Sequence, residues 1–221
     1  MLSKKKFLET VDQLLSRNNL NDGEKDRFKN IKKNETQLPE EITAEILIEK
    51  LDLIDINTIT NEEGYYKEFV NTIDNDIEDN QTEIFYLLKG KQVSCLHILK
   101  TTEKWNWIAG NAISLFIERG KELTEITLNE GSQSFTIEKD TIFGAKITTP
   151  ENNDFVLVTC LCIPGFKKEH YINPTSEQID ELYNYNQKNK TIIDALTKNS
   201  CSAKKTEEQT PLTNSPQNNS R

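Results

Sequence analysis

The sequence has 221 residues, with 36 acidic and 27 basic side chains and a formal net charge of −9. So acidic a chain argues against nucleic-acid binding, because contacts to phosphates need clustered Lys and Arg. The sequence has no run of about 18 apolar residues, so we expect no membrane-spanning helix. Its length suits one domain of ordinary size with appendages.

The first part of the chain has the spacing of amphipathic helices. Residues 1–20 place apolar side chains at helical intervals, and residues 38–54 do so again around Pro39, which suits a first helical turn. The polar residues 21–37 between them predict a loop with a partial helix. Towards the other end, residues 176–185 predict a short helix that Ser176 caps.

Between these helices, from residue 83 on, the apolar pattern changes to the alternation of β-strands. Short runs separated by turn-forming Gly and Asn residues follow one another at nearly regular spacing. They cover residues 83–88, 93–99, 104–109, 114–118, 123–128, 134–138, 141–148 and 155–163. Many short strands of this kind predict an antiparallel sandwich or barrel, so the expected fold class is mainly β.

The four cysteines contain no C-x-x-C pair, which argues against a structural zinc site. Cys160 and Cys162 stand two apart in a strand-like run, so we expect both to be buried on one face as small apolar side chains. Reduced thiols, together with an N-terminus too charged for a signal-peptide core, predict a cytoplasmic protein. The polar C-terminal tail leaves a secreted effector as the alternative.

The segment CLHILKTTEKWNWIAG, residues 95–110, carries the residues that point most clearly to a function. Alternation predicts two sets that each share a face: Cys95, His97 and Leu99 on one strand, and Glu103, Trp105 and Trp107 on the next. The three-residue connection between the strands predicts a hairpin. One base, one acid and large aromatic surfaces on a concave wall would suit a small-molecule pocket.

The same segment resembles the first motif of the cupins, in which Gly, His-x-His, Glu and Gly follow at fixed spacings. Gly90, His97, Glu103 and Gly110 stand at those spacings here, whereas Leu99 replaces the second histidine. The second cupin motif is absent.

A closer similarity is to cupin superfamily 5, a family also called domain of unknown function 985. The family's motifs match, in the same order, NEEGYYKE at 61–68, LHI at 96–98, TTEKWNWIAG at 101–110 and CLCIPGF at 160–166. The likeness covers residues 42–173, and the chain departs from the family at the polar residues Glu63, Asn106 and His170.

This resemblance implies an RmlC-like cupin, an antiparallel β-barrel or jelly roll with N-terminal helices and a short C-terminal helix. Residues 1–38 would form a helical N-terminal extension, residues 39–186 the cupin domain, and residues 187–221 a largely disordered polar tail. Cupins commonly pair through strand exchange or sheet edges, so the resemblance also implies a homodimer.

The candidate ligand-binding residues are His97, Glu103, Trp105, Trp107, Tyr65, Tyr66 and Tyr171. Tyr65 and Tyr66 would point to opposite faces of a strand, so we expect one to pack and the other to reach the pocket or an interface. Only His97 and Glu103 match cupin metal ligands, and His170 would add a third only if its segment folds over the barrel mouth. Because metal sites usually take three or four protein ligands, we expect no cofactor, with weak divalent-metal binding by His97 and Glu103 as the alternative.

Three functions remain open at this point. The first is binding of a small molecule without a tightly bound metal. The second, which the cupin resemblance includes, is a metal-independent sugar epimerase or isomerase with His97 as the catalytic base and a tyrosine supplying a phenol. The third is a catalytically inactive interaction protein, such as a bacterial effector, whose termini carry the role.

Overall fold

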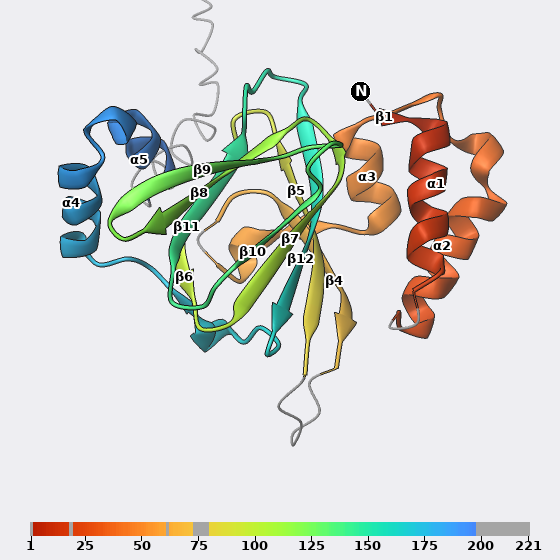
Figure 1. Ribbon diagram of the computed structural model, residues 1–221. Coiled ribbons are helices and arrows are strands. Elements are labelled where there is room, and N and C mark those ends of the chain that lie inside the picture. Colours follow the sequence, from red (N-terminus) through yellow and green to blue (C-terminus); the bar gives the residue numbers. More distant parts are fainter. Residues whose placement is uncertain (1, 18–19, 61, 73–79, 198–221) are drawn as a thin grey trace, which may run out of the picture.

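The computed structural model describes residues 2–17, 20–60, 62–72 and 80–197. Two antiparallel sheets face each other, and helices cover the outer side of each sheet (Figure 1). This is the mainly β architecture that the alternating pattern predicts, in the jelly-roll form that the cupin resemblance implies. All eight predicted runs are strands, β5 to β12 of the structure.

The first sheet has six strands in the order β10-β7-β12-β5-β4-β3. Their bounds are β3 Ile54–Asp55, β4 Tyr65–Asn71, β5 Thr82–Lys89, β7 Thr102–Gly110, β10 Ser134–Ile137 and β12 Phe155–Ile163. The central strands β5 and β12 are almost wholly buried, because this sheet packs against helices on one face and against the second sheet on the other.

The second sheet has five strands in the order β13-β6-β11-β8-β9. Their bounds are β6 Val93–Leu99, β8 Ile113–Arg119, β9 Glu122–Leu128, β11 Ile142–Ile147 and β13 Tyr171–Ile172. Every residue of β6 is buried, so this strand too is covered on both faces.

The predicted hairpin between β6 and β7 is wrong. β6 pairs with β11 and β13 in the five-stranded sheet, whereas β7 pairs with β12 and β10 in the six-stranded sheet. The short connection between them therefore carries the chain from one sheet to the other. As a result, the strands that hold His97 and Glu103 contribute to opposite walls of the interior.

The N-terminal helices are α1 Lys4–Leu15, α2 Asp22–Lys33 and α3 Ala44–Leu51, and the short strands β1 Leu2–Ser3 and β2 Glu41–Ile42 pair beside them. Helix α1 confirms its prediction. Helix α3 begins later than predicted from Pro39, because Ile42 belongs to β2 and the Thr43 hydroxyl accepts the capping hydrogen bond from the Ile46 N–H.

Helix α2 replaces the loop with a partial helix that was predicted for residues 21–37. The Asn21 side chain caps it by accepting a hydrogen bond from the Glu24 N–H at 2.8 Å, and acidic residues lie in its first turn. Phe28 and Ile31 are buried in the cluster that also contains α1 residues. The helix thus depends on packing against α1 more than on its own apolar content.

Two helices follow the last strand, α4 Ser176–Tyr185 and α5 Lys190–Leu196. Helix α4 was predicted, but its cap is Thr175, which forms a capping box with Gln178, and not Ser176. Helix α5 lies in the segment expected to be a largely disordered tail from residue 187. It forms because Ile193 and Leu196 are fully buried against the outer face of the five-stranded sheet. The remainder of that tail lies outside the described residues.

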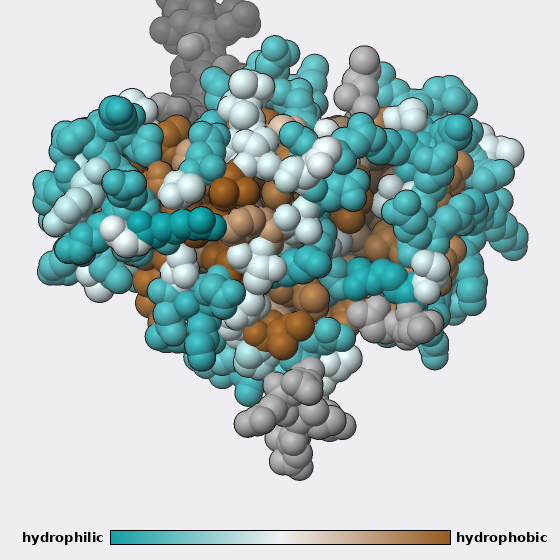
Figure 2. Space-filling model, in the orientation of Figure 1, coloured by the Kyte–Doolittle hydropathy of each residue, from teal (hydrophilic) through white to brown (hydrophobic). Residues whose placement is uncertain are grey.

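The buried side chains form three apolar clusters, one beneath α1–α3, one between the sheets and one beneath α4 and α5. In Figure 2, hydrophilic side chains cover the outward faces of the helices, and hydrophobic ones are concentrated over the strands between them. Among the described residues, no helix is both long and apolar enough to cross a membrane.

Candidate functional site

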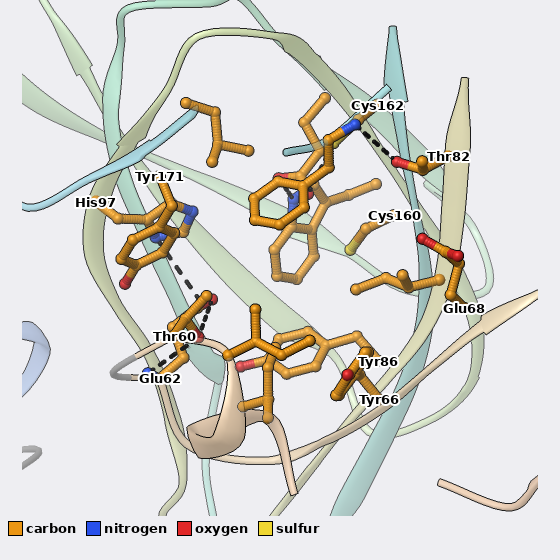
Figure 3. Close-up of a pocket in the computed structure, with 17 residues that line it drawn as sticks. Thr60, Glu62, Tyr66, Glu68, Thr82, Tyr86, His97, Cys160, Cys162 and Tyr171 are labelled. Atoms are coloured by element: carbon orange, nitrogen blue, oxygen red, sulfur yellow. Dashed lines mark hydrogen bonds and ion pairs between the residues drawn. The ribbon is translucent and has the colours of Figure 1, made fainter. Parts of the chain in front are cut away.

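A cavity of about 100 Å³ lies between the two sheets, at the end where β13 and the segment before β4 approach the interior (Figure 3). Most of the surface that faces the cavity is apolar, and eight of the 17 lining residues are apolar or aromatic: Ile56, Ile59, Tyr66, Ile84, Tyr86, Leu99, Trp105 and Phe166. The polar part of the wall comprises Thr60, Glu62, Glu68, Thr82, His97, Glu103, Cys160, Cys162 and Tyr171. An apolar enclosure with a few polar groups is typical of a small-molecule site.

A β-bulge in β6 places His97 on the cavity wall. Phe143 of β11 pairs with His97 and Ala145 pairs with Ser94, so Cys95 and Leu96 together face the single residue Gly144. The extra residue turns Cys95 outward into the cluster beneath α4 and α5. The prediction that Cys95 and His97 share a face is therefore wrong, because it assumed unbroken alternation.

Gly144 is required for this bulge. A Cβ atom at this position would lie 2.8 Å from the Ser94 carbonyl oxygen and 3.2 Å from the Leu96 nitrogen. Both neighbours are backbone atoms, so a side chain would displace the strand that carries His97.

The hydrogen bonds of His97 define which of its nitrogens is available. Nδ1 lies 2.7 Å from the Cys95 carbonyl oxygen, which can only accept, so Nδ1 carries the proton. In the neutral ring Nε2 is then an acceptor, and within the described residues it has no hydrogen-bond partner. The ring stacks on Tyr171 at 5.0 Å and contacts Phe143 at 4.1 Å between centroids. His97 thus presents one lone pair to the cavity.

Glu62 is a functional candidate that sequence reasoning missed. It is buried, accepts a hydrogen bond from the Ser94 hydroxyl at 2.6 Å and another from the Thr60 hydroxyl at 3.2 Å, and its Oε1 lies 3.8 Å from Nδ1 of His97. The available signal was its position in NEEGYYKE, one of the four stretches that resemble the family's motifs. Its partner Ser94 is inward-facing only because of the bulge.

Glu103 lies across the cavity on β7. Its Oε2 accepts a hydrogen bond from the Trp105 indole N–H at 2.6 Å, and the Cys162 thiol lies 3.8 Å from Oε1. Burial, with a smaller contribution from the nearby Glu62 charge, raises the pKa of Glu103 to about 8, although the bond from Trp105 acts in the opposite direction. At neutral pH the carboxyl group therefore retains its proton.

The structure brings together five of the seven predicted site residues: His97, Glu103, Trp105, Tyr66 and Tyr171. It also confirms that Cys160 and Cys162 are buried on one side of β12, where both line the cavity as free thiols. Burial raises the pKa of each thiol, so both are held in the neutral form.

Tyr65 and Trp107 lie away from the cavity. Tyr65 points to the opposite side of β4 from Tyr66 and packs against the cluster beneath the N-terminal helices. Trp107 lies between the sheets, but it is beyond the cavity and its indole N–H donates to the Asn111 carbonyl at 3.0 Å. Both rings have packing roles here.

The cavity does not suit a resident metal ion. Leu99, in place of the second cupin histidine, is part of the wall, and His170 is not. Among the described residues, no three His, Cys, Asp or Glu side chains come close enough together to share an ion.

Comparison with known families decides the classification. The model of Cupin_5, described as Cupin superfamily (DUF985), matches residues 45–172. The chain belongs to this cupin family. The matched range agrees closely with the residues 42–173 over which the four motifs were recognised, and no curated protein matches the chain.

Two solved structures share this fold. A Shewanella oneidensis protein is 23% identical with a TM-score of 0.59, and the match covers 71% of this chain and 98% of that one. A hypothetical protein from Leishmania major is 22% identical with a TM-score of 0.58, with 71% and 99% covered. At this identity the likeness extends to the fold alone.

Proposed function

We propose that this cupin binds a small molecule in the cavity between its sheets, without a tightly bound metal. The observation that carries the proposal is the Tyr171 hydroxyl, which is buried at the wall and has no hydrogen-bond partner within the described residues. A buried hydroxyl without a partner costs about 1–3 kcal/mol, and a ligand in the cavity would satisfy it. The free Nε2 of the neighbouring His97 supports the same conclusion.

A thermal-shift screen of small molecules on the full chain, followed by native mass spectrometry of each hit, tests this proposal. We expect a one-to-one complex and a raised melting temperature. Tyr171→Phe should weaken binding of a hit, whereas Tyr65→Phe, the same change on the opposite face of a strand, should not. If no molecule in a broad screen stabilises the chain, the binding proposal fails, and an interaction function becomes the better explanation.

Elemental analysis of the purified protein tests the metal part separately. We expect no transition metal in stoichiometric amount. One ion per chain that survives dialysis against a chelator would contradict this part of the proposal, whatever the small-molecule screen reports.

A second candidate function, metal-independent proton transfer, is supported by the pairing of two groups in one cavity. His97 Nε2 can accept a proton, and Glu103, whose pKa is raised to about 8, can donate one. A substrate between them could lose a proton on one side and gain one on the other, which is an isomerisation. A diphosphate-linked sugar does not fit well, because no Lys or Arg lines the described wall.

Solvent exchange measures this activity directly. Hits from the screen are incubated with the chain in D₂O, and loss of a C–H signal in the NMR spectrum reports proton abstraction. His97→Gln should abolish the exchange while preserving the fold. If the parent protein exchanges the proton no faster than the His97→Gln variant, the proposed proton transfer is wrong and only binding remains.

The homodimer and the cytoplasmic location remain predictions. Light scattering of the full chain measures the first, and a mass of one chain would contradict it.

A further inference from the structure

The carboxyl groups around the cavity have no cationic partner in its described lining. Glu62 and Glu103 are buried in its wall, Glu68 lies at its exposed rim, and no Lys or Arg is part of the described lining. Arg17 does not supply a cation to the cavity. Its guanidinium pairs with both oxygens of Glu83, and Glu83 lies on β5 but faces the N-terminal helices. An anionic ligand would therefore enter a low-dielectric space with carboxyl groups and no counter-charge.

The polar atoms left open in the wall are mainly acceptors. His97 Nε2 accepts because Nδ1 already donates to the Cys95 carbonyl. The Tyr171 oxygen has no partner, and the carboxyl groups of Glu62 and Glu103 each have lone pairs that their known donors do not use. A ligand that presents several N–H donors from one atom would satisfy these groups together. An ammonium group has three such donors and no acceptor.

Aromatic rings occupy much of the remaining wall. Trp105 and Tyr86 meet edge to face at 5.8 Å, and Tyr66, Phe166 and Tyr171 lie around the same space. Such rings attract a cation through their negative faces and also bury an apolar group. The wall therefore combines the acidic and the aromatic elements that recognise amines.

We propose that the ligand of this cavity is a small organic cation, a protonated primary amine that carries one apolar group. This inference rests on the small-molecule binding proposed above and adds the chemical class of the ligand. The ammonium group pairs with Glu62 and donates to His97 Nε2 and to an oxygen of the neutral Glu103 carboxyl group, and the apolar group lies against Trp105 and Tyr86. A neutral analogue keeps the apolar contacts and loses the charge interaction.

The experiment is calorimetric titration of the full chain with benzylamine, benzyl alcohol and benzoate at neutral pH. The three probes share one ring and differ in charge. We expect benzylamine to bind at least about tenfold more tightly than benzyl alcohol, because only the amine gains the charge-assisted contacts. Benzoate should give no measurable binding.

Isosteric variants assign the preference to Glu62. Glu62→Gln should reduce the advantage of benzylamine over benzyl alcohol several-fold, whereas Glu103→Gln, which replaces a carboxyl group that is already neutral at this pH, should change it little. Glu122→Gln, which removes the same charge from an exposed position on β9, should leave the advantage unchanged. If Glu62→Gln does not fold, as judged by circular dichroism, Glu62→Asp, which draws the carboxyl group back by one methylene, decides the assignment by the same comparison.

Three results would overturn the inference. Equal binding of benzyl alcohol, or tighter binding of benzoate, refutes the amine class but leaves small-molecule binding intact. Failure of all three probes to bind at millimolar concentration also refutes it, and the broad screen then decides the proposed function independently. Retention of the amine preference in the folded Glu62 variant refutes the assigned contacts.

Discussion

The carboxyl group of Glu103 should make the stability of the protein depend on pH in a direction that the structure fixes. Burial raises the pKa of Glu103 from 4.5 to about 8. Between these values the folded chain holds a proton that the unfolded chain has released, so stability falls as pH rises. This contribution is complete below about pH 4.5 and is lost by about pH 8. At about 1.4 kcal/mol per pH unit, the loss amounts to about 5 kcal/mol at most.

The substitution Glu103→Gln isolates this contribution. It preserves the size of the side chain and an oxygen that can accept the Trp105 indole N–H, but it cannot ionise. We expect the variant to match the parent near about pH 5 and to be more stable by several kcal/mol near about pH 9. Urea unfolding followed by circular dichroism at both pH values measures the difference.

Glu122→Gln is the control, because its carboxyl group is exposed on β9. Its difference from the parent should stay within about 0.5 kcal/mol at both pH values. If the parent and Glu103→Gln lose stability in parallel as pH rises, then Glu103 is solvated and ionises as in the unfolded chain. That result would refute the reasoning.

Three further predictions concern the free energy of unfolding in urea. Tyr171→Phe removes a buried hydroxyl without a partner, so stability should be unchanged or rise by up to about 1 kcal/mol. A loss of more than about 1 kcal/mol would show that the hydroxyl does form a hydrogen bond, and would contradict this prediction. Gly144→Ala should cost about 1–3 kcal/mol because its Cβ meets backbone at 2.8 Å, whereas Gly23→Ala, in helix α2, should be neutral or stabilising. Arg17→Met leaves Glu83 buried and unpaired and should cost about 3 kcal/mol, most of which an added Glu83→Gln recovers; no recovery would contradict the charge argument.

Much of the fold could be predicted from the sequence because it depends on local patterns. The eight strands β5–β12 follow from alternation and from turn residues between the runs, which are properties of neighbouring positions. The family motifs located His97 and Glu103 for the same reason, since their spacing is a local feature. Helices α2 and α5 escaped prediction because each is stabilised by residues far away in the chain.

The site itself depended on long-range structure. Alternation alone placed Cys95 beside His97, and only the pairing of β6 with Gly144 revealed the bulge that reverses Cys95 and turns Ser94 towards Glu62. The segment 95–110 looked like one hairpin, yet its two strands belong to different sheets.

The sequence by itself determined the eight strands β5–β12, the cupin family and the positions of His97 and Glu103 in its motifs. The tertiary structure alone decided which ring faces the cavity, since Tyr66 and Trp105 line it while Tyr65 and Trp107 pack elsewhere. It also decided the protonation of Glu103, because a pKa follows from desolvation by side chains that only the closed sandwich brings together.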